Sequence, residues 1–94
     1  METGEPYIWD EKKRAANLRE HRIDFNEVYR FDWQTAVVFV DDREDYGELR
    51  EVAIGFIDPG LYVLTFTRRG EQTRIISLRK AEKSDVRKYA EATR

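Results

Sequence analysis

Four runs of β-branched and aromatic residues follow one another between residues 35 and 80, with only short segments between them. The runs are TAVVFVD, ELREVAIGFI, LYVLTFTR and QTRIISLRK. Such residues favour strands. The connections Asp58-Pro59-Gly60 and Arg69-Gly70-Glu71 are typical of tight turns, because proline presets one turn dihedral and glycine tolerates positive φ. Since short connections join antiparallel strands, the pattern predicts a four-stranded antiparallel meander.

Helical segments precede the meander. Residues 10–22, DEKKRAANLREHR, are rich in good helix formers, and Asp10 is a candidate N-cap. Asp24 and Glu27 have the spacing of a capping box, followed by apolar residues at helical spacing. We therefore expect two N-terminal helices.

A further helix is expected at the C-terminal end. After Ser84, a candidate cap, a helical spacing connects Val86, Tyr89, Ala90 and Thr93. A chain of 94 residues has room for one hydrophobic core. The sequence thus predicts a single α+β domain over residues 1–94, with two N-terminal helices, a four-stranded antiparallel sheet and a C-terminal helix.

Composition excludes several classes of protein. The chain has no cysteine and one histidine, which argues against a disulfide framework, a thiolate metal site or a histidine-rich metal site. Nothing at the N-terminus resembles a signal peptide, and no apolar run approaches the roughly 18 residues that span a bilayer. We expect a soluble cytoplasmic protein that needs no cofactor or metal and does not contact a membrane.

Charge is distributed unevenly along the chain. Residues 1–23 hold five acidic and five basic residues, residues 24–58 hold ten acidic and three basic, and residues 68–94 hold four acidic and nine basic. The net charges are therefore 0, -7 and +5. Because local potential steers encounter, the C-terminal third suits a polyanion and the middle segment suits a basic partner. The alternative is an ordinary solvated surface with uneven charge.

The segment RIISLRKA, residues 74–81, places basic residues in a predicted strand. Strict alternation puts Ile75, Ser77 and Arg79 on one face, and it puts Arg74, Ile76, Leu78 and Lys80 on the other. A guanidinium on a rigid strand suits a phosphate, because its fork of donors is held in place. In the alternative interpretation, Arg79 forms a cross-strand ion pair with Glu48 or Glu51.

Glu48 and Arg50 are two residues apart in a predicted strand, so they share a face. A carboxylate that accepts a proton beside a guanidinium that stabilises negative charge is suited to phosphodiester cleavage. The same pair is also a common surface ion pair.

The first predicted helix carries Lys13, Asn17 and His21 within one polar arc. His21 is the natural acid–base candidate near neutral pH. Alternatively, a histidine in the last helical turn satisfies the terminal carbonyls or the helix dipole.

The loop DDREDYGE is rich in carboxylates, namely Asp41, Asp42, Glu44, Asp45 and Glu48. Their spacing does not match an EF-hand loop. We therefore expect a solvated hairpin loop and no metal site.

Three blocks of the chain together resemble a known family. They are WDEKKRAANLREHRIDF, GELREVAIG and TRRGEQTRIISLRKA, with Tyr89 downstream. In this order and at these separations they resemble the BrnT family, the toxins of type II toxin–antitoxin pairs. One departure concerns Arg22, where the family usually has a glycine that serves as a left-handed helix cap.

The resemblance implies a RelE-like fold, metal-independent cleavage of RNA, and inhibition of translation and growth. It also implies neutralisation by a BrnA-like ribbon-helix-helix antitoxin, so that DNA is contacted only through the antitoxin. The expected assembly is a homodimer or a toxin–antitoxin heterotetramer. The rival interpretation is a catalytically inactive module that binds RNA or protein only within a repressor complex.

Residue roles follow from the resemblance together with the chemistry above. In the expected reaction an RNA 2′-hydroxyl attacks the adjacent phosphate, and Arg50 and Arg79 stabilise the added negative charge. Either Glu48 or His21 accepts the proton, and either Lys13 or Tyr89 donates one to the leaving oxygen. The RNA-binding positions that the resemblance implies are Arg74, Lys80, Asn17, Thr67 and Ser77.

Overall fold

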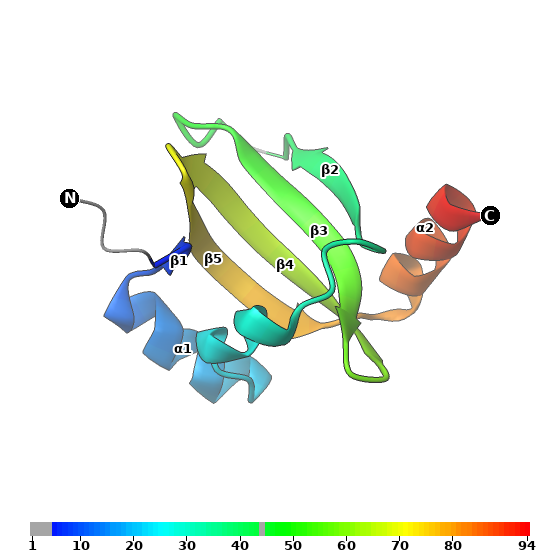
Figure 1. Ribbon diagram of the computed structural model, residues 1–94, viewed down its shortest axis with the longest axis horizontal. Coiled ribbons are helices and arrows are strands. Elements are labelled where there is room, and N and C mark those ends of the chain that lie inside the picture. Colours follow the sequence, from blue (N-terminus) through cyan, green and yellow to red (C-terminus); the bar gives the residue numbers. More distant parts are fainter. Residues whose placement is uncertain (1–4, 44) are drawn as a thin grey trace.

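A computed structural model describes residues 5–43 and 45–94 of the protein (Figure 1). The elements follow in the order β1 (Tyr7–Ile8), α1 (Glu11–His21), the 3-10 helix η1 (Phe25–Arg30), β2 (Val37–Asp41), β3 (Arg50–Ile57), β4 (Gly60–Arg69), β5 (Gln72–Lys80) and α2 (Lys83–Thr93). Glu44, one of the acids of the predicted loop, lies outside the described residues. The α+β class and the C-terminal helix are confirmed.

The sheet contains the four predicted strands and one more. Strands β2 to β5 form the predicted antiparallel meander. The prediction of a purely antiparallel sheet is wrong, because β1 pairs in parallel with β5 at Thr73 and Arg74. The sheet is therefore mixed, with the order β1-β5-β4-β3-β2. Two residues are too few to form a periodic pattern, so β1 left no signal in the sequence.

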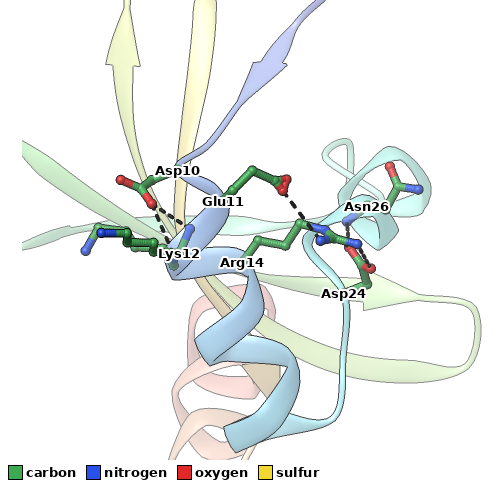
Figure 2. Close-up of polar contacts among 7 residues, drawn as sticks. Asp10, Glu11, Lys12, Arg14, Asp24 and Asn26 are labelled. Atoms are coloured by element: carbon green, nitrogen blue, oxygen red, sulfur yellow. Dashed lines mark hydrogen bonds and ion pairs between the residues drawn. The ribbon is translucent and has the colours of Figure 1, made fainter.

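The start of α1 is the predicted one. The Asp10 carboxylate accepts hydrogen bonds from the backbone N–H groups of Lys12, at 2.7 Å, and Lys13, at 3.3 Å (Figure 2). These two bonds are the main reason that the pKa of Asp10 lies below its ordinary value. An aspartate cap of this kind satisfies N–H groups that have no partner inside the helix.

The second predicted helix is a 3-10 helix, not an α-helix. Asp24 caps it by accepting a hydrogen bond from the Asn26 N–H at 2.9 Å. The Glu27 carboxylate pairs with Arg30 instead of completing a capping box. Arg14 donates from Nε and Nη2 to both Asp24 oxygens, at 3.0 and 2.8 Å, and so ties α1 to the start of η1 (Figure 2).

The core lies between η1 and one face of the sheet. Its buried side chains are Phe25, Val28, Phe31, Ala53, Ile57, Leu64, Phe66, Ile75 and Leu78. Helix α1 runs beside β5 and contributes one buried residue, Asn17. The long aromatic and aliphatic side chains of the meander pack against η1 on this face, so η1 does not cover the opposite face of the sheet.

Helix α2 packs on that opposite face, at the end near β2 and β3. The Lys88 ammonium lies 4.3 Å from the centroid of the Phe39 ring. The Tyr89 ring meets Phe56 edge to face at 5.7 Å, and its hydroxyl donates to the Thr35 carbonyl at 2.8 Å. Within the described ranges, no helix is both long and apolar enough to cross a bilayer.

Two local predictions are corrected, and the structure shows how the turn at Arg22 forms. The N-cap of α2 is Glu82, not Ser84. Arg22 takes the left-handed conformation itself, with φ of 62°, so the turn after α1 keeps its geometry without the glycine. In the β3–β4 turn the residue with positive φ is Asp58, at 52°, and not Gly60.

Candidate functional site

A β-bulge in β5 decides which side chains share the face opposite the core. The pairs Val63↔Arg79, Thr65↔Ser77 and Thr67↔Arg74 skip Ile76, where the register shifts. Residues paired across antiparallel strands lie on the same face. Ser77, Arg79 and Arg74 therefore share one face, and the prediction that Arg74 lies opposite Arg79 is wrong.

The bulge also corrects the face of Ile75, whereas Lys80 lies on the face opposite Arg79, as alternation predicts. Ile75, predicted to lie beside Arg79, is fully buried in the core with Leu78. Lys80 is exposed near Arg22 and Tyr62 on the core side of the sheet. The structure thus separates Lys80 from Arg79 and brings Arg74 onto the face of Arg79.

A cleft of about 410 Å³ lies on this face, between the sheet, the end of α1 and the start of α2. Apolar side chains of β2, β3 and β4 form part of its lining. Its polar lining falls into two groups: Asp41, Asp42 and Arg43 lie at the end of β2, and the residues used below are His21, Thr65, Ser77, Arg79, Asp85 and Lys88. The cleft therefore combines cations, carboxylates and one histidine on a partly apolar surface.

The guanidinium of Arg79 is held by the start of α2. Its Nη1 lies 2.8 Å and its Nη2 3.3 Å from the two carboxylate oxygens of Asp85, and Nη1 also donates to the Lys80 carbonyl at 3.2 Å. Arg79 is chiefly what holds the pKa of Asp85 below its ordinary value. The alternative of a pair with Glu48 or Glu51 is wrong, since these acids pair with Arg69 and Arg68.

Arg79 keeps donors for a ligand. A guanidinium has five N–H donors, and the three bonds above use three of them. The remaining two, the Nε–H and one Nη2–H, have no partner among the described residues and lie on adjacent nitrogens of one edge. This edge matches two oxygens of a phosphate.

His21 reaches the same cleft from the last turn of α1. Its side chain is 31% exposed, and its Nε2 lies 3.8 Å from Glu20. The Leu18 carbonyl near this helix end accepts a hydrogen bond from the backbone N–H of Arg22. His21 is therefore not needed as the cap of that carbonyl and faces the cleft that contains Arg79.

Glu48 and Arg50 form the predicted close pair, but neither lines this cleft and both lie far from Arg79. Glu48 precedes β3, its Oε2 is 3.7 Å from Arg50 Nε, and its Oε1 accepts from Arg69 at 3.2 Å. The Arg50 guanidinium lies 3.9 Å from the centroid of the Tyr46 ring. Cross-strand pairing places Ile54 of β3, Val63 of β4 and Arg79 of β5 in one row. Arg50 lies four residues before Ile54 on β3, two strands away from Arg79. With about 3.3 Å per residue and 4.8 Å per strand, their backbones are roughly 16 Å apart.

Asn17 is buried, with 5% exposure, and bonds to the backbone. Its amide nitrogen donates to the carbonyls of Leu78, at 2.8 Å, and Ile23, at 3.1 Å, while its oxygen accepts from the Leu78 N–H at 3.1 Å. The pairing of β1 with β5 ends at Arg74. Asn17 therefore takes the place of a neighbouring strand at the edge of β5.

The other two predicted catalytic residues lie apart from the cleft. Lys13 is exposed in the first turn of α1, eight residues and about 12 Å before His21. The Tyr89 hydroxyl is already used by the Thr35 carbonyl. Neither residue lines the cleft of Arg79.

Asp85, Lys88 and Thr65 line the cleft although the sequence did not single them out as site residues. Asp85 and Lys88 are three residues apart on α2, so one helix face presents both. The sequence shows this spacing, but it does not show that α2 packs beside β5 and so brings both residues to the cleft. No group of three or more potential metal ligands occurs within residues 5–43 and 45–94.

Comparison with known proteins identifies a family. A family model described as "Ribonuclease toxin, BrnT, of type II toxin-antitoxin system" matches residues 9–85. The matched range covers α1, the whole meander and the start of α2 with Asp85. No curated protein matches the chain.

Proposed function

Because the chain belongs to the BrnT family of ribonuclease toxins of type II toxin–antitoxin systems, we propose that it cleaves RNA, without a metal ion, in the cleft around Arg79. One observation carries the proposal: Arg79, with two unused donors on one edge, lines the same cleft as His21. A charge-stabilising group and a proton carrier are the two functions that transesterification of RNA requires.

In the proposed reaction, His21 accepts the proton of a 2′-hydroxyl as its oxygen attacks the adjacent phosphorus. A new O–P bond forms, the bond to the 5′-oxygen breaks, and the leaving oxygen takes up a proton from water. Arg79 stabilises the extra negative charge on phosphorus through its Nε and Nη2 donors. Lys88 and Ser77 line the same cleft and are proposed to bind the non-bridging oxygens.

Glu48, Arg50, Lys13 and Tyr89 receive no part in this step. A base acts within hydrogen-bond distance of the proton it removes. Glu48 is paired with Arg50, and the backbone of Arg50 lies too far from that of Arg79 for Glu48 to act on a phosphate bound at Arg79. His21 is therefore the proposed base in preference to Glu48.

Membership of a type II family brings with it an antitoxin partner, and we propose a BrnA-like ribbon-helix-helix protein in this role. Of the acidic loop residues, Asp42 and Asp45 are exposed. Asp41 is buried and bonded by Arg43 at 2.8 and 2.9 Å. Asp42 and Asp45 are thus the acids proposed to attract a basic antitoxin.

The purified protein incubated with bulk RNA in EDTA tests the proposed activity. We expect cleavage by the wild type and loss of at least about a hundredfold in rate for R79A. The matched control is R87A, because Arg87 is an exposed cation on α2 outside the cleft. Equal activity of R79A and R87A, or no cleavage by soluble wild type, would contradict the proposal and favour a binding module.

A pH profile tests the role of His21. If His21 is the base, kcat/KM of the wild type shows a limb that rises with pH, and the H21Q variant loses that limb. An H21Q protein that is slower but keeps the same profile would show that another group accepts the proton.

A further inference from the structure

A second row of cationic side chains lies on the face that carries the cleft. Thr67 pairs with Arg74 across β4 and β5. Between β3 and β4 the last pair is Glu51↔Phe66. Extending this register by one residue places Arg50 opposite Thr67. Arg74, Thr67 and Arg50 therefore form one row across three strands, four residues of β4 beyond the row of Arg79.

This row contains polar atoms without partners. Thr67 is 2% exposed, and its hydroxyl and the Arg50 Nε are buried without a hydrogen-bond partner among the described residues. Arg50 is in contact with Glu48, but at 3.7 Å and without a hydrogen bond from Nε. A buried polar atom without a partner is costly, so such atoms are uncommon unless a ligand or solvent supplies the partner.

Arg74 differs from the neighbouring arginines of its hairpin. Arg68 donates to Glu51 at 2.8 Å and Arg69 to Glu48 at 3.2 Å. Half-buried Arg74 has no hydrogen bond or ion pair within residues 5–43 and 45–94, and it acts on Asp10 only through longer-range attraction.

What the row lacks is an acceptor. A guanidinium only donates, and a threonine hydroxyl can donate as well as accept. An anion with several oxygens would accept first from Arg74. The Thr67 hydroxyl and Arg50 Nε are covered in this structure, and they would donate to the same anion once the side chains over them, such as the Tyr46 ring on Arg50, move aside. A phosphate has this shape and charge.

We propose that Arg74, Thr67 and Arg50 form a second phosphate subsite, which holds another backbone phosphate of the RNA strand whose scissile phosphate lies at Arg79. This inference rests on the proposed function. Four residues of β4 correspond to about 13 Å, which is longer than one nucleotide. The substrate is therefore a single strand that runs along the open face over several nucleotides, and a dinucleotide contacts only the cleft.

The test compares a dinucleotide with an RNA extended by several nucleotides on both sides of the same scissile bond. For R74A we expect KM for the long RNA to rise about tenfold, the effect of one charged hydrogen bond, with the dinucleotide kinetics unchanged. T67V, which keeps the shape, is expected to raise KM for the long RNA without lowering the melting temperature. The matched control is R68A, which removes one charge from the same hairpin on the opposite face.

Binding of a non-cleavable 2′-O-methyl RNA of both lengths separates the two proposals. If the wild type binds the long strand more tightly and R74A abolishes that advantage, the subsite stands even where no cleavage is seen. If R74A weakens both lengths equally, matches R68A, or weakens only antitoxin binding, the subsite is overturned, whatever the activity.

Discussion

Replacement of Asn17 by alanine is expected to lower the free energy of unfolding. We do not expect it to act through a direct contact with RNA. The Asn17 amide makes three hydrogen bonds, two of them to the fully buried Leu78 and one to the Ile23 carbonyl. A buried backbone group left without a partner costs about 1–3 kcal/mol. Loss of the two Leu78 bonds alone thus predicts a destabilisation of about 2–6 kcal/mol.

A loss of about 3 kcal/mol corresponds to a melting temperature roughly 12–24 °C lower for a domain of this size. It is also a large share of the 5–15 kcal/mol typical of a folded domain. Thermal and urea unfolding of N17A measure it, with R19A as the control, because Arg19 is exposed on the same helix. N17D is expected to be at least as unstable as N17A, since a carboxylate cannot donate to the two carbonyls.

The result that would refute this reasoning is an N17A protein as stable as R19A. If such a protein also bound RNA more weakly, Asn17 would be an RNA contact, as the family resemblance implies. Binding must therefore be measured at a temperature at which each variant is shown to be folded.

Three further predictions concern other parts of the fold. D42N and D45N together are expected to slow antitoxin association at low salt and to leave dissociation nearly unchanged; an association rate equal to wild type over a salt series would remove the loop from the interface. Since Arg79 lowers the pKa of Asp85 in the folded state, this group stabilises the fold above its unfolded pKa of about 3.9 and loses that contribution as pH falls through its folded pKa. Urea unfolding of D85N should therefore show less loss of stability below about pH 4 than wild type, and an unchanged slope would contradict the pairing. G55A should lower stability by about 1–3 kcal/mol, because a Cβ at Gly55 would lie 2.7 Å from an atom of the Phe31 ring; calorimetry showing no loss would mean that the ring moves aside.

Sequence alone determined the features that arise from local chemistry. The four strands of the meander follow from runs of β-branched and aromatic residues between turn residues. Helix α1 follows from its helix formers and the Asp10 cap. Each of these signals is contained within a few neighbouring residues, so no knowledge of the distant chain was needed.

Tertiary structure decided which side chains act together. Alternation predicts faces only for an unbroken strand, and the one extra residue at Ile76 moved Arg74 to the face of Arg79. Asn17 has the spacing of a surface residue, but the edge of β5 lies against it and buries its amide. Asp85 holds Arg79 only because the chain turns back after β5. Contacts between distant segments depend on register and packing, which no local pattern of residues encodes.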